Sequence, residues 1–196
     1  MLAKDKCLKK IKYIIFLIIF IIPPPSFAKN IEKEILEYNN SLKNTSTLFI
    51  QTDGNTIEEG IIYIGENRIK IDYLKPKKIS LILSEKKGMY IDHELQETQF
   101  FNVEKSHVSV FLKVLIGKNI FKESELKTME NQAVVKHNFE LEELKYTAEI
   151  IYENNPLKIR KIRLLEKKVV FEMGFFNNIK HESNDKKFFA LISPYI

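Results

Sequence analysis

The chain has 196 residues, a formal net charge of +5 and a single cysteine, Cys7. One cysteine excludes an intrachain disulfide and a site built from several thiolates, and 44% hydrophobic residues are enough to form a globular core. The positive charge would favour an anionic partner if it were spread over the folded domain, so its position in the sequence decides what it means.

The first 28 residues have the features of a secretory signal peptide. Lysines precede an unbroken apolar run at 13–22 (YIIFLIIFII), and Ser26-Phe27-Ala28 fits a small-x-small cleavage site. Ten helical residues rise only about 15 Å, against about 30 Å of bilayer hydrocarbon, so the alternative of a permanent membrane anchor is disfavoured. We therefore predict a cleaved signal peptide at 1–28 and a single exported domain at 29–196.

The export signal accounts for most of the net charge. Residues 1–28 contain five of the 31 basic residues and one of the 26 acidic residues, which leaves 26 basic and 25 acidic residues in 29–196. A net charge of +1 gives little electrostatic basis for binding nucleic acid, whose affinity for proteins comes largely from its phosphates. We expect no nucleic-acid partner.

The first half of the exported domain predicts a helix followed by antiparallel strands. Residues 31–42 carry an apolar stripe at helical spacing, with Asn30 as the expected N-cap. In 57–73, a turn at Gly65-Glu66-Asn67 separates a β-branched run from a strictly alternating one, which indicates a β-hairpin. The predicted strands of this half are 47–52, 57–64, 68–73, 78–84, 89–92 and 96–101.

A second helix is predicted at 106–117, where the alternation stops. Ser106 is the expected cap and Gly117 the expected end. The apolar residues that recur at i, i+3, i+4 and i+7 are Val108, Phe111, Leu112 and Leu115.

Strands resume after this helix, at 126–129, 133–139, 146–152, 157–165 and 168–176. In the fourth of them, Arg160 and Arg163 fall on opposite faces unless a bulge intervenes. A short apolar segment that begins at Phe188 ends near Pro194.

About ten or eleven short antiparallel strands and two amphipathic helices predict a mainly β fold. A sheet of this length curls into a barrel or an incomplete barrel, and the helices must bury their apolar faces at its open mouth. Two interpretations of the interior stay open. The apolar side chains either fill a packed core, or they leave an apolar cavity under a helical lid.

Short motifs follow the predicted first helix in a fixed order and extend over nearly all of 29–196. The motifs are Phe49-Ile-Gln51, Asp53-Gly54, Gly60-x-x-Tyr63-Ile64, Arg68-Ile-Lys-Ile-Asp-Tyr73, Lys75-Pro76, Tyr90-Ile-Asp92 with Glu94-Leu95-Gln96, Asn155-Pro156-Leu157, and Phe188-Phe189 before Pro194. In this order they resemble the periplasmic outer-membrane lipoprotein carrier family, LolA.

The resemblance implies an incomplete antiparallel β-barrel that is closed by the N-terminal and inserted helices around an apolar cavity. It implies a monomeric periplasmic chaperone without a cofactor or metal. Such a carrier accepts the acyl chains of triacylated lipoproteins from an inner-membrane ABC transporter and passes them to a receptor lipoprotein at the outer membrane. Each acyl CH₂ removed from water is worth about 0.8 kcal/mol, so a long chain needs a cavity to cross an aqueous space.

The cavity residues that the resemblance implies come from the strands and from the inserted helix. They are Phe49, Ile62, Ile64, Ile69, Ile71, Tyr73, Leu81, Leu83, Tyr90, Val108, Phe111, Leu112 and Leu115. The family commonly has a basic residue followed by proline in the turn that is Gly65-Glu66-Asn67 here, and that basic residue is thought to control lid closure. In this sequence Arg68 is the nearest basic residue, so it is a candidate lid contact; a solvated strand charge is the alternative.

The sequence offers no pattern of catalytic residues. The four histidines, His93, His107, His137 and His181, lack the spacing of metal ligands. Glu58-Glu59 and Glu142-Glu143 are adjacent pairs whose side chains diverge on a strand. We therefore expect a protein that is not an enzyme. The alternative to a carrier is a lipid- or lipoprotein-binding sensor or structural module of the same fold that does not shuttle its ligand, and a lipid hydrolase is a third hypothesis.

Overall fold

The computed structural model describes residues 31–116, 120–181 and 186–195, which belong to one compact unit. The predicted signal peptide, the expected cap Asn30 and the expected helix end at Gly117 lie outside these ranges. Within them, no helix has the length and apolar character needed to cross a membrane.

Eleven strands make a single antiparallel sheet. They are β1 (Thr45–Thr52), β2 (Ile57–Ile64), β3 (Ile69–Lys75), β4 (Ile79–Leu83), β5 (Lys87–Asp92), β6 (Glu97–Asn102), β7 (Ser124–Thr128), β8 (Gln132–Leu141), β9 (Leu144–Glu153), β10 (Lys158–Leu165) and β11 (Val169–Lys180). Their order in the sheet is β6-β5-β4-β3-β2-β1-β11-β10-β9-β8-β7. In the described residues the end strands β6 and β7 do not pair, so the sheet is open. The predicted incomplete β-barrel with a helical lid is confirmed.

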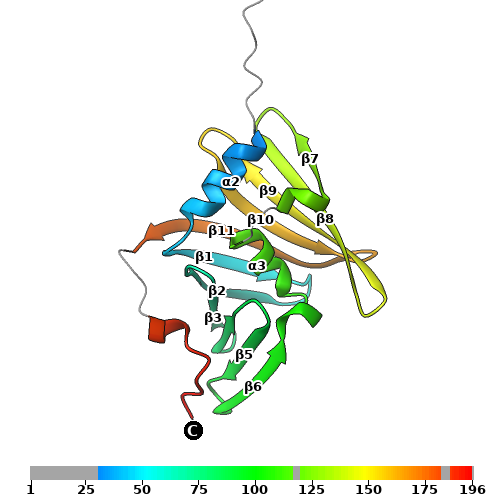
Figure 1. Ribbon diagram of the computed structural model, residues 1–196. Helices are drawn as coiled ribbons and strands as arrows, with labels where there is room; N and C mark the ends of the chain where they lie inside the picture. Colours follow the sequence, from blue (N-terminus) through cyan, green and yellow to red (C-terminus); the bar gives the residue numbers. More distant parts are fainter. Residues whose placement is uncertain (1–30, 117–119, 182–185, 196) are drawn as a thin grey trace, which may run out of the picture. The chain divides into compact units, whose positions relative to one another are not determined.

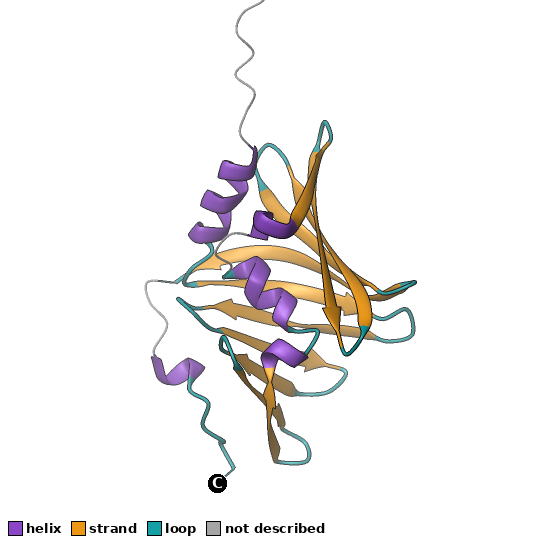
Figure 2. Ribbon diagram, turned by 45° about the vertical axis from the view of Figure 1, so that its right-hand side comes forward, coloured by secondary structure: helices purple, strands orange, loops and turns teal. Residues whose placement is uncertain are grey.

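Two α-helices lie on one face of this sheet, which we call the inner face (Figures 1 and 2). Helix α2 (Ile31–Ser41) leads into β1, and helix α3 (Ser109–Leu115) is inserted between β6 and β7. Short 3-10 helices occur at η1 (Val103–Lys105), η2 (Ile120–Glu123) and η3 (Lys186–Phe189). Apolar side chains of α2, α3 and the inner face form one buried cluster, so both helices are part of the core.

The N-cap of helix α3 lies two residues after Ser106, the cap that the sequence predicts. The Ser106 hydroxyl accepts a hydrogen bond from the backbone N–H of Val108 at 3.4 Å, in the turn before the helix. The N-cap residue is Val108, which makes no side-chain capping bond. A seven-residue helix without a side-chain cap has little stability of its own, so α3 depends on its packing against the sheet.

The outer face of the sheet differs between its two ends. On β8 to β11, Lys136, Glu149, Arg163, Glu172 and Lys161 form a network of ion pairs with N···O distances from 2.6 to 3.2 Å. The register of β10 against β9 shifts between Ile159 and Lys161, so the bulge that the sequence left open is present at Arg160.

The opposite end of the outer face is covered by the C-terminal segment 187–195. Leu191 packs against a small apolar cluster of Ile82, Met89 and Ile91 on β4 and β5. The hydroxyls of Thr98 and Ser193 lie 2.9 Å apart, and the Tyr195 hydroxyl lies 2.8 Å from Nδ1 of His93. The predicted apolar segment after Phe188 therefore buries strand side chains on the face away from the helices.

Candidate functional site

The inner face of β1 to β5 is a continuous apolar wall. Cross-strand pairs place its members side by side: Ile62 lies opposite Ile71, which lies opposite Leu81, and Ile64 lies opposite Ile69, which lies opposite Leu83. The predicted wall residues that are buried are Phe49, Ile62, Ile64, Ile69, Ile71, Leu81 and Leu83. The structure thus brings these predicted residues together on the face that the helices cover.

Phe49 reaches this wall because β2 has a glycine opposite it. Phe49 pairs with Gly60, and a Cβ at Gly60 would lie 2.6 Å from the Phe49 ring and would also clash with the backbone carbonyl of Asp72. The absence of a side chain at Gly60 lets the aromatic ring lie directly on the strand.

Two tyrosines complete the wall and are partly buried. Tyr73 meets the Phe49 ring edge-to-face with centroids 5.2 Å apart, and its hydroxyl donates to Oε1 of Gln51 at 3.4 Å. Burial, together with the nearby Glu58 carboxylate, raises the pKa of Tyr73 well above its ordinary value, so its hydroxyl stays protonated. Tyr90 lies opposite Leu81 on the same face, and burial raises its pKa as well.

Helix α3 presents different residues to the sheet and to the solvent. Its buried residues are Val110, Phe111, Val114 and Leu115, and Phe111 stacks on Phe171 of β11 with centroids 5.7 Å apart. Of the predicted stripe, Phe111 and Leu115 are buried, whereas Val108 and Leu112 are only partly buried. The face that packs on the sheet is therefore rotated from the one that the spacing predicts.

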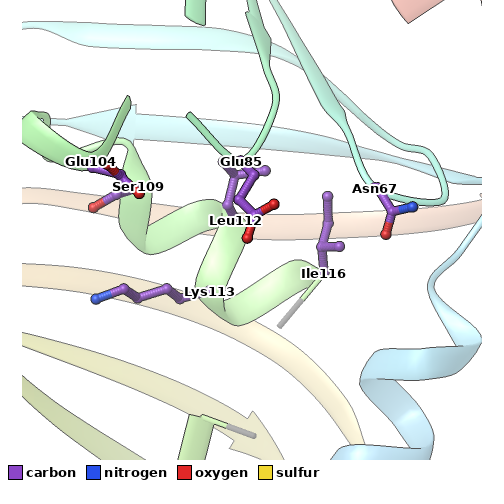
Figure 3. Close-up of a pocket in the computed structure, with 7 residues that line it drawn as sticks. All are labelled: Asn67, Glu85, Glu104, Ser109, Leu112, Lys113 and Ile116. Atoms are coloured by element: carbon purple, nitrogen blue, oxygen red, sulfur yellow. The ribbon is translucent and has the colours of Figure 1, made fainter. Parts of the chain in front are cut away.

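The partly buried side of α3 lines a pocket of about 680 Å³. Figure 3 shows Leu112 and Ile116 as its apolar residues, with Ser109 and Lys113 on the same helix. Three polar residues from other segments complete the lining: Asn67 from the β2–β3 turn, Glu85 from the β4–β5 turn and Glu104 from η1. The pocket has an apolar strip along α3 and a polar rim, a combination that suits an amphiphilic ligand.

Arg68 does not reach α3 through any hydrogen bond that the described residues make. Its guanidinium donates to the backbone carbonyl of Phe189 at 2.7 Å, and the Phe189 ring packs against Gly65 in the turn before Arg68. In this structure Arg68 joins the β2–β3 turn to the C-terminal segment.

An aromatic cluster lies beneath the other side of α3, on the β8–β9 hairpin. The Phe139 ring stacks on Tyr146 and on His137, with centroids 5.6 Å and 6.1 Å away. His107, in the turn before α3, meets the edge of Tyr146 at 4.7 Å, and Nζ of Lys113 lies 5.7 Å from the Phe139 centroid. We call His107, His137, Phe139 and Tyr146 the hairpin cluster.

The described residues do not gather three or more His, Cys, Asp or Glu side chains in a position to hold a metal ion. His137 and His107 belong to the hairpin cluster, His93 lies 2.8 Å from the Ser80 hydroxyl, and the Ser46 hydroxyl lies 2.8 Å from Nε2 of His181. The four histidines therefore lie at three separate places in the fold.

Comparison with known proteins gives a likeness of fold. No family model matches the sequence, and no curated protein matches it. An uncharacterized conserved protein from Thermus thermophilus aligns with a TM-score of 0.52 and 10% identity over 84% of this chain and 96% of that one. MucB aligns with a TM-score of 0.50 and 8% identity over 85% of this chain and 64% of its own, so this chain spans less than two thirds of MucB.

These likenesses establish the fold alone. The sequence comparisons give no support for membership of the lipoprotein carrier family, so the resemblance seen in the short motifs holds at the level of the barrel and its helices. MucB has also been solved in complex with MucA(peri), and the Pseudomonas aeruginosa MucA/MucB complex is known as well.

Sequence reasoning did not identify most of the pocket rim. Asn67 and Glu85 lie in separate turns that only the folded sheet brings beside α3, and Glu104 lies in η1, outside the helical stripe that the sequence shows. Ile116 could have been found, because it follows Leu112 by four residues and so extends the same helical stripe.

Proposed function

We propose that this protein is a periplasmic lipoprotein carrier that holds acyl chains between α3 and the apolar wall of β1 to β5. The observation that carries the proposal is the position of α3, a short apolar helix that covers an open half-barrel and has a pocket along its partly buried side. In this proposal an inner-membrane ABC transporter donates the lipoprotein, and an outer-membrane receptor lipoprotein accepts it. The carrier is a monomer that the predicted signal peptide directs to the periplasm.

The size of the pocket fits an entry site for such a ligand. Its volume of about 680 Å³ lies within the range of about 300 to 1,000 Å³ that small-molecule sites occupy. Each CH₂ of an acyl chain that is removed from water contributes about 0.8 kcal/mol to binding. The strip of Leu112 and Ile116 offers the first apolar surface on which such CH₂ groups can be buried. The polar rim would face the polar part of the cargo.

Full binding requires α3 to lift from the wall. Its buried residues belong to the same apolar cluster as Ile69, Ile71 and Leu83, so acyl chains would replace the helix face by an apolar surface of the same kind. Exchanging one apolar contact for another costs little, since hydrophobic burial is non-directional. Closure of α3 on the wall would then release the cargo without a chemical step.

The test is a soluble complex with cargo. The protein is purified from the cell envelope after expression of the full chain, incubated with inner-membrane vesicles that carry a triacylated lipoprotein and its releasing transporter, and separated from the vesicles. We expect lipoprotein in the soluble fraction together with this protein. Lipoprotein that stays entirely with the vesicles would reject the proposal.

A matched pair of variants locates the binding site. Leu112→Glu places a charge on the apolar strip of the pocket, so we expect the amount of soluble complex to fall by about tenfold or more. Leu95→Glu makes the same change at a residue that is 67% exposed in the β5–β6 turn, and it should leave the complex unchanged. Equal effects of the two substitutions would place the cargo elsewhere.

A second candidate is a binding module that retains a lipoprotein or another protein instead of passing it on. The observation in its favour is the fold that this chain shares with MucB, a protein that forms a complex with MucA(peri). The two candidates separate in the second half of the assay, when acceptor outer membranes are added. A carrier gives up its cargo to them, and a retaining module keeps it.

A further inference from the structure

We propose that the contact between α3 and the hairpin cluster is an acid-sensitive latch, in which neutral His137 keeps α3 on the sheet and protonated His137 releases it. This inference rests on the proposed function in one respect, since it supplies a condition under which the lid opens. Its physical content concerns α3 and the β8–β9 hairpin alone.

The hairpin cluster is connected to α3 in two ways. One of its members, His107, lies in the turn that leads into the helix and packs against Tyr146, and within the helix, Lys113 places its ammonium over Phe139. Phe139 stacks on both Tyr146 and His137, so the four rings form one connected contact under α3. Within the described residues, the side chains of α3 make no hydrogen bond to the sheet, so these ring contacts and the apolar packing hold the helix in place.

His137 is placed to be neutral while α3 is closed. Its side chain is 8% exposed, its Nδ1 shares a hydrogen bond of 3.2 Å with the Ser124 hydroxyl, and its Nε2 is buried without a hydrogen-bond partner among the described residues. Protonation would place a donor on each nitrogen, so the buried Nε2–H would lack an acceptor among those residues. Burial, reinforced by the Lys113 ammonium, lowers the pKa of His137 below its ordinary value of 6.5.

The charged groups around His137 come from several elements. Lys113 on α3 opposes its protonation, whereas the backbone and carboxylate of Glu123 on η2 favour it. On β9 its cross-strand partner is Ala148, and on β7 it is Ser124, neither of which carries a charge. His107 is the other titratable ring of the cluster, and the rings of Tyr146 and Phe139 stand between the two histidines.

The direction of the coupling follows from linkage. When α3 lifts, the Lys113 ammonium leaves, so one of the two causes that lower the pKa of His137 is lost and this pKa rises toward 6.5. The open state therefore binds a proton more readily than the closed state, and acid must favour opening. The closed state is fully favoured above about pH 6.5, and this preference is lost as the pH falls from 6.5 through the lower pKa of the closed state.

Hydrogen exchange of the α3 amides tests the latch without any lipid. The exported form of the full chain is compared at about pH 7.5 and about pH 5, a range in which histidine changes its charge, and the rates are corrected for intrinsic exchange. We expect the protection of Val114 and Leu115 to fall relative to amides of β1 to β3, by about tenfold for each unit between the open and closed pKa. An unchanged ratio of protection would overturn the latch.

Variants assign the effect to His137. In His137→Gln and His137→Phe the side chain cannot titrate, so the pH dependence of α3 exchange should disappear, and either folded variant is sufficient. The matched control is His181→Gln. His181 follows the end of β11 and shares a hydrogen bond with Ser46 of β1, so its replacement should leave the pH dependence of α3 exchange intact. A pH response that survives in the His137 variants would contradict the assignment.

The outcome is separable from that of the carrier proposal. A missing pH response with normal uptake of lipoprotein would overturn the latch and leave the carrier standing. A normal pH response with no uptake of lipoprotein would support the latch and count against the carrier.

Discussion

The two helices on the inner face are held there by different kinds of contact. Helix α2 has a buried polar anchor, because the amide of Asn39 and the hydroxyl of Tyr152 on β9 exchange hydrogen bonds of 3.1 Å and 3.3 Å. Helix α3 is held by apolar side chains and by the rings of the hairpin cluster. A hydrogen-bonded anchor needs its specific partner, whereas an apolar surface accepts any apolar substitute, so α2 is suited to stay and α3 to exchange with a ligand.

The largest effect should come from a matched pair of core truncations. Ile35 on α2 and Leu115 on α3 are both fully buried aliphatic residues. Ile35→Ala should lower the free energy of unfolding by about 2 to 5 kcal/mol, the usual cost of such a cavity. Leu115→Ala should lower the free energy of unfolding clearly less. If α3 can undock while the rest of the protein stays folded, a substitution on α3 cannot cost more than the free energy of docking α3 on the sheet.

Urea unfolding of both variants measures this difference, with the slope against urea checked for two-state behaviour. Equal losses for Ile35→Ala and Leu115→Ala would mean that α3 is as firmly built into the core as α2. That result would remove the physical basis for treating α3 as a lid.

A smaller effect is expected at the polar anchor of α2. Asn39→Ala leaves the buried Tyr152 hydroxyl without its partner, which should cost about 1 to 3 kcal/mol in the free energy of unfolding. Adding Tyr152→Phe removes the orphaned hydroxyl, so the double variant should recover part of the loss. If the loss in the free energy of unfolding of the double variant equals the sum of the losses of the two single variants, the hydrogen bond is not the anchor of α2.

The sequence predicts the sheet better than it predicts the helix on top of it. In β3 the residues alternate strictly, so Ile69, Ile71 and Tyr73 can only share one face, and they line the inner face as expected. In α3 nearly every position is apolar, so the spacing of Val108, Phe111, Leu112 and Leu115 was one of several that fit. Which face of α3 is buried depends on the side chains that the sheet presents to it, such as Phe171, on which Phe111 stacks.

Pocket and latch residues lie beyond the reach of sequence pattern for a different reason. Glu85 and Glu104 reach the pocket from a turn and from a 3-10 helix, outside the helical stripe of α3. His137 feels the charge of Lys113 only because both side chains lie beside the ring of Phe139. Such contacts depend on the curvature of the sheet and on the path of the inserted segment, and neither leaves a periodic signal. Spacing alone could show that the four histidines form no metal motif, but it could not show which of them is buried.

The smallest effect concerns the charge that α3 places over the hairpin cluster. Lys113→Met keeps an unbranched side chain near Phe139 and removes the ammonium. The contact of an ammonium with an aromatic ring at an exposed site is worth about 0.5 to 1 kcal/mol, so α3 amides should exchange about two- to fivefold faster at neutral pH. The same loss raises the pKa of His137 in the closed state, because one of the two causes that lower it is gone. The pH range over which α3 opens, which lies between the pKa values of His137 in the closed and open states, should therefore narrow in Lys113→Met.

Lys127→Met, on the exposed side of β7, is the matched control and should change neither the exchange rate of the α3 amides nor this pH range. If Lys113→Met exchanges no faster than the control, the helix is held by its apolar face alone, and the hairpin cluster contributes nothing to the difference between α3 and α2.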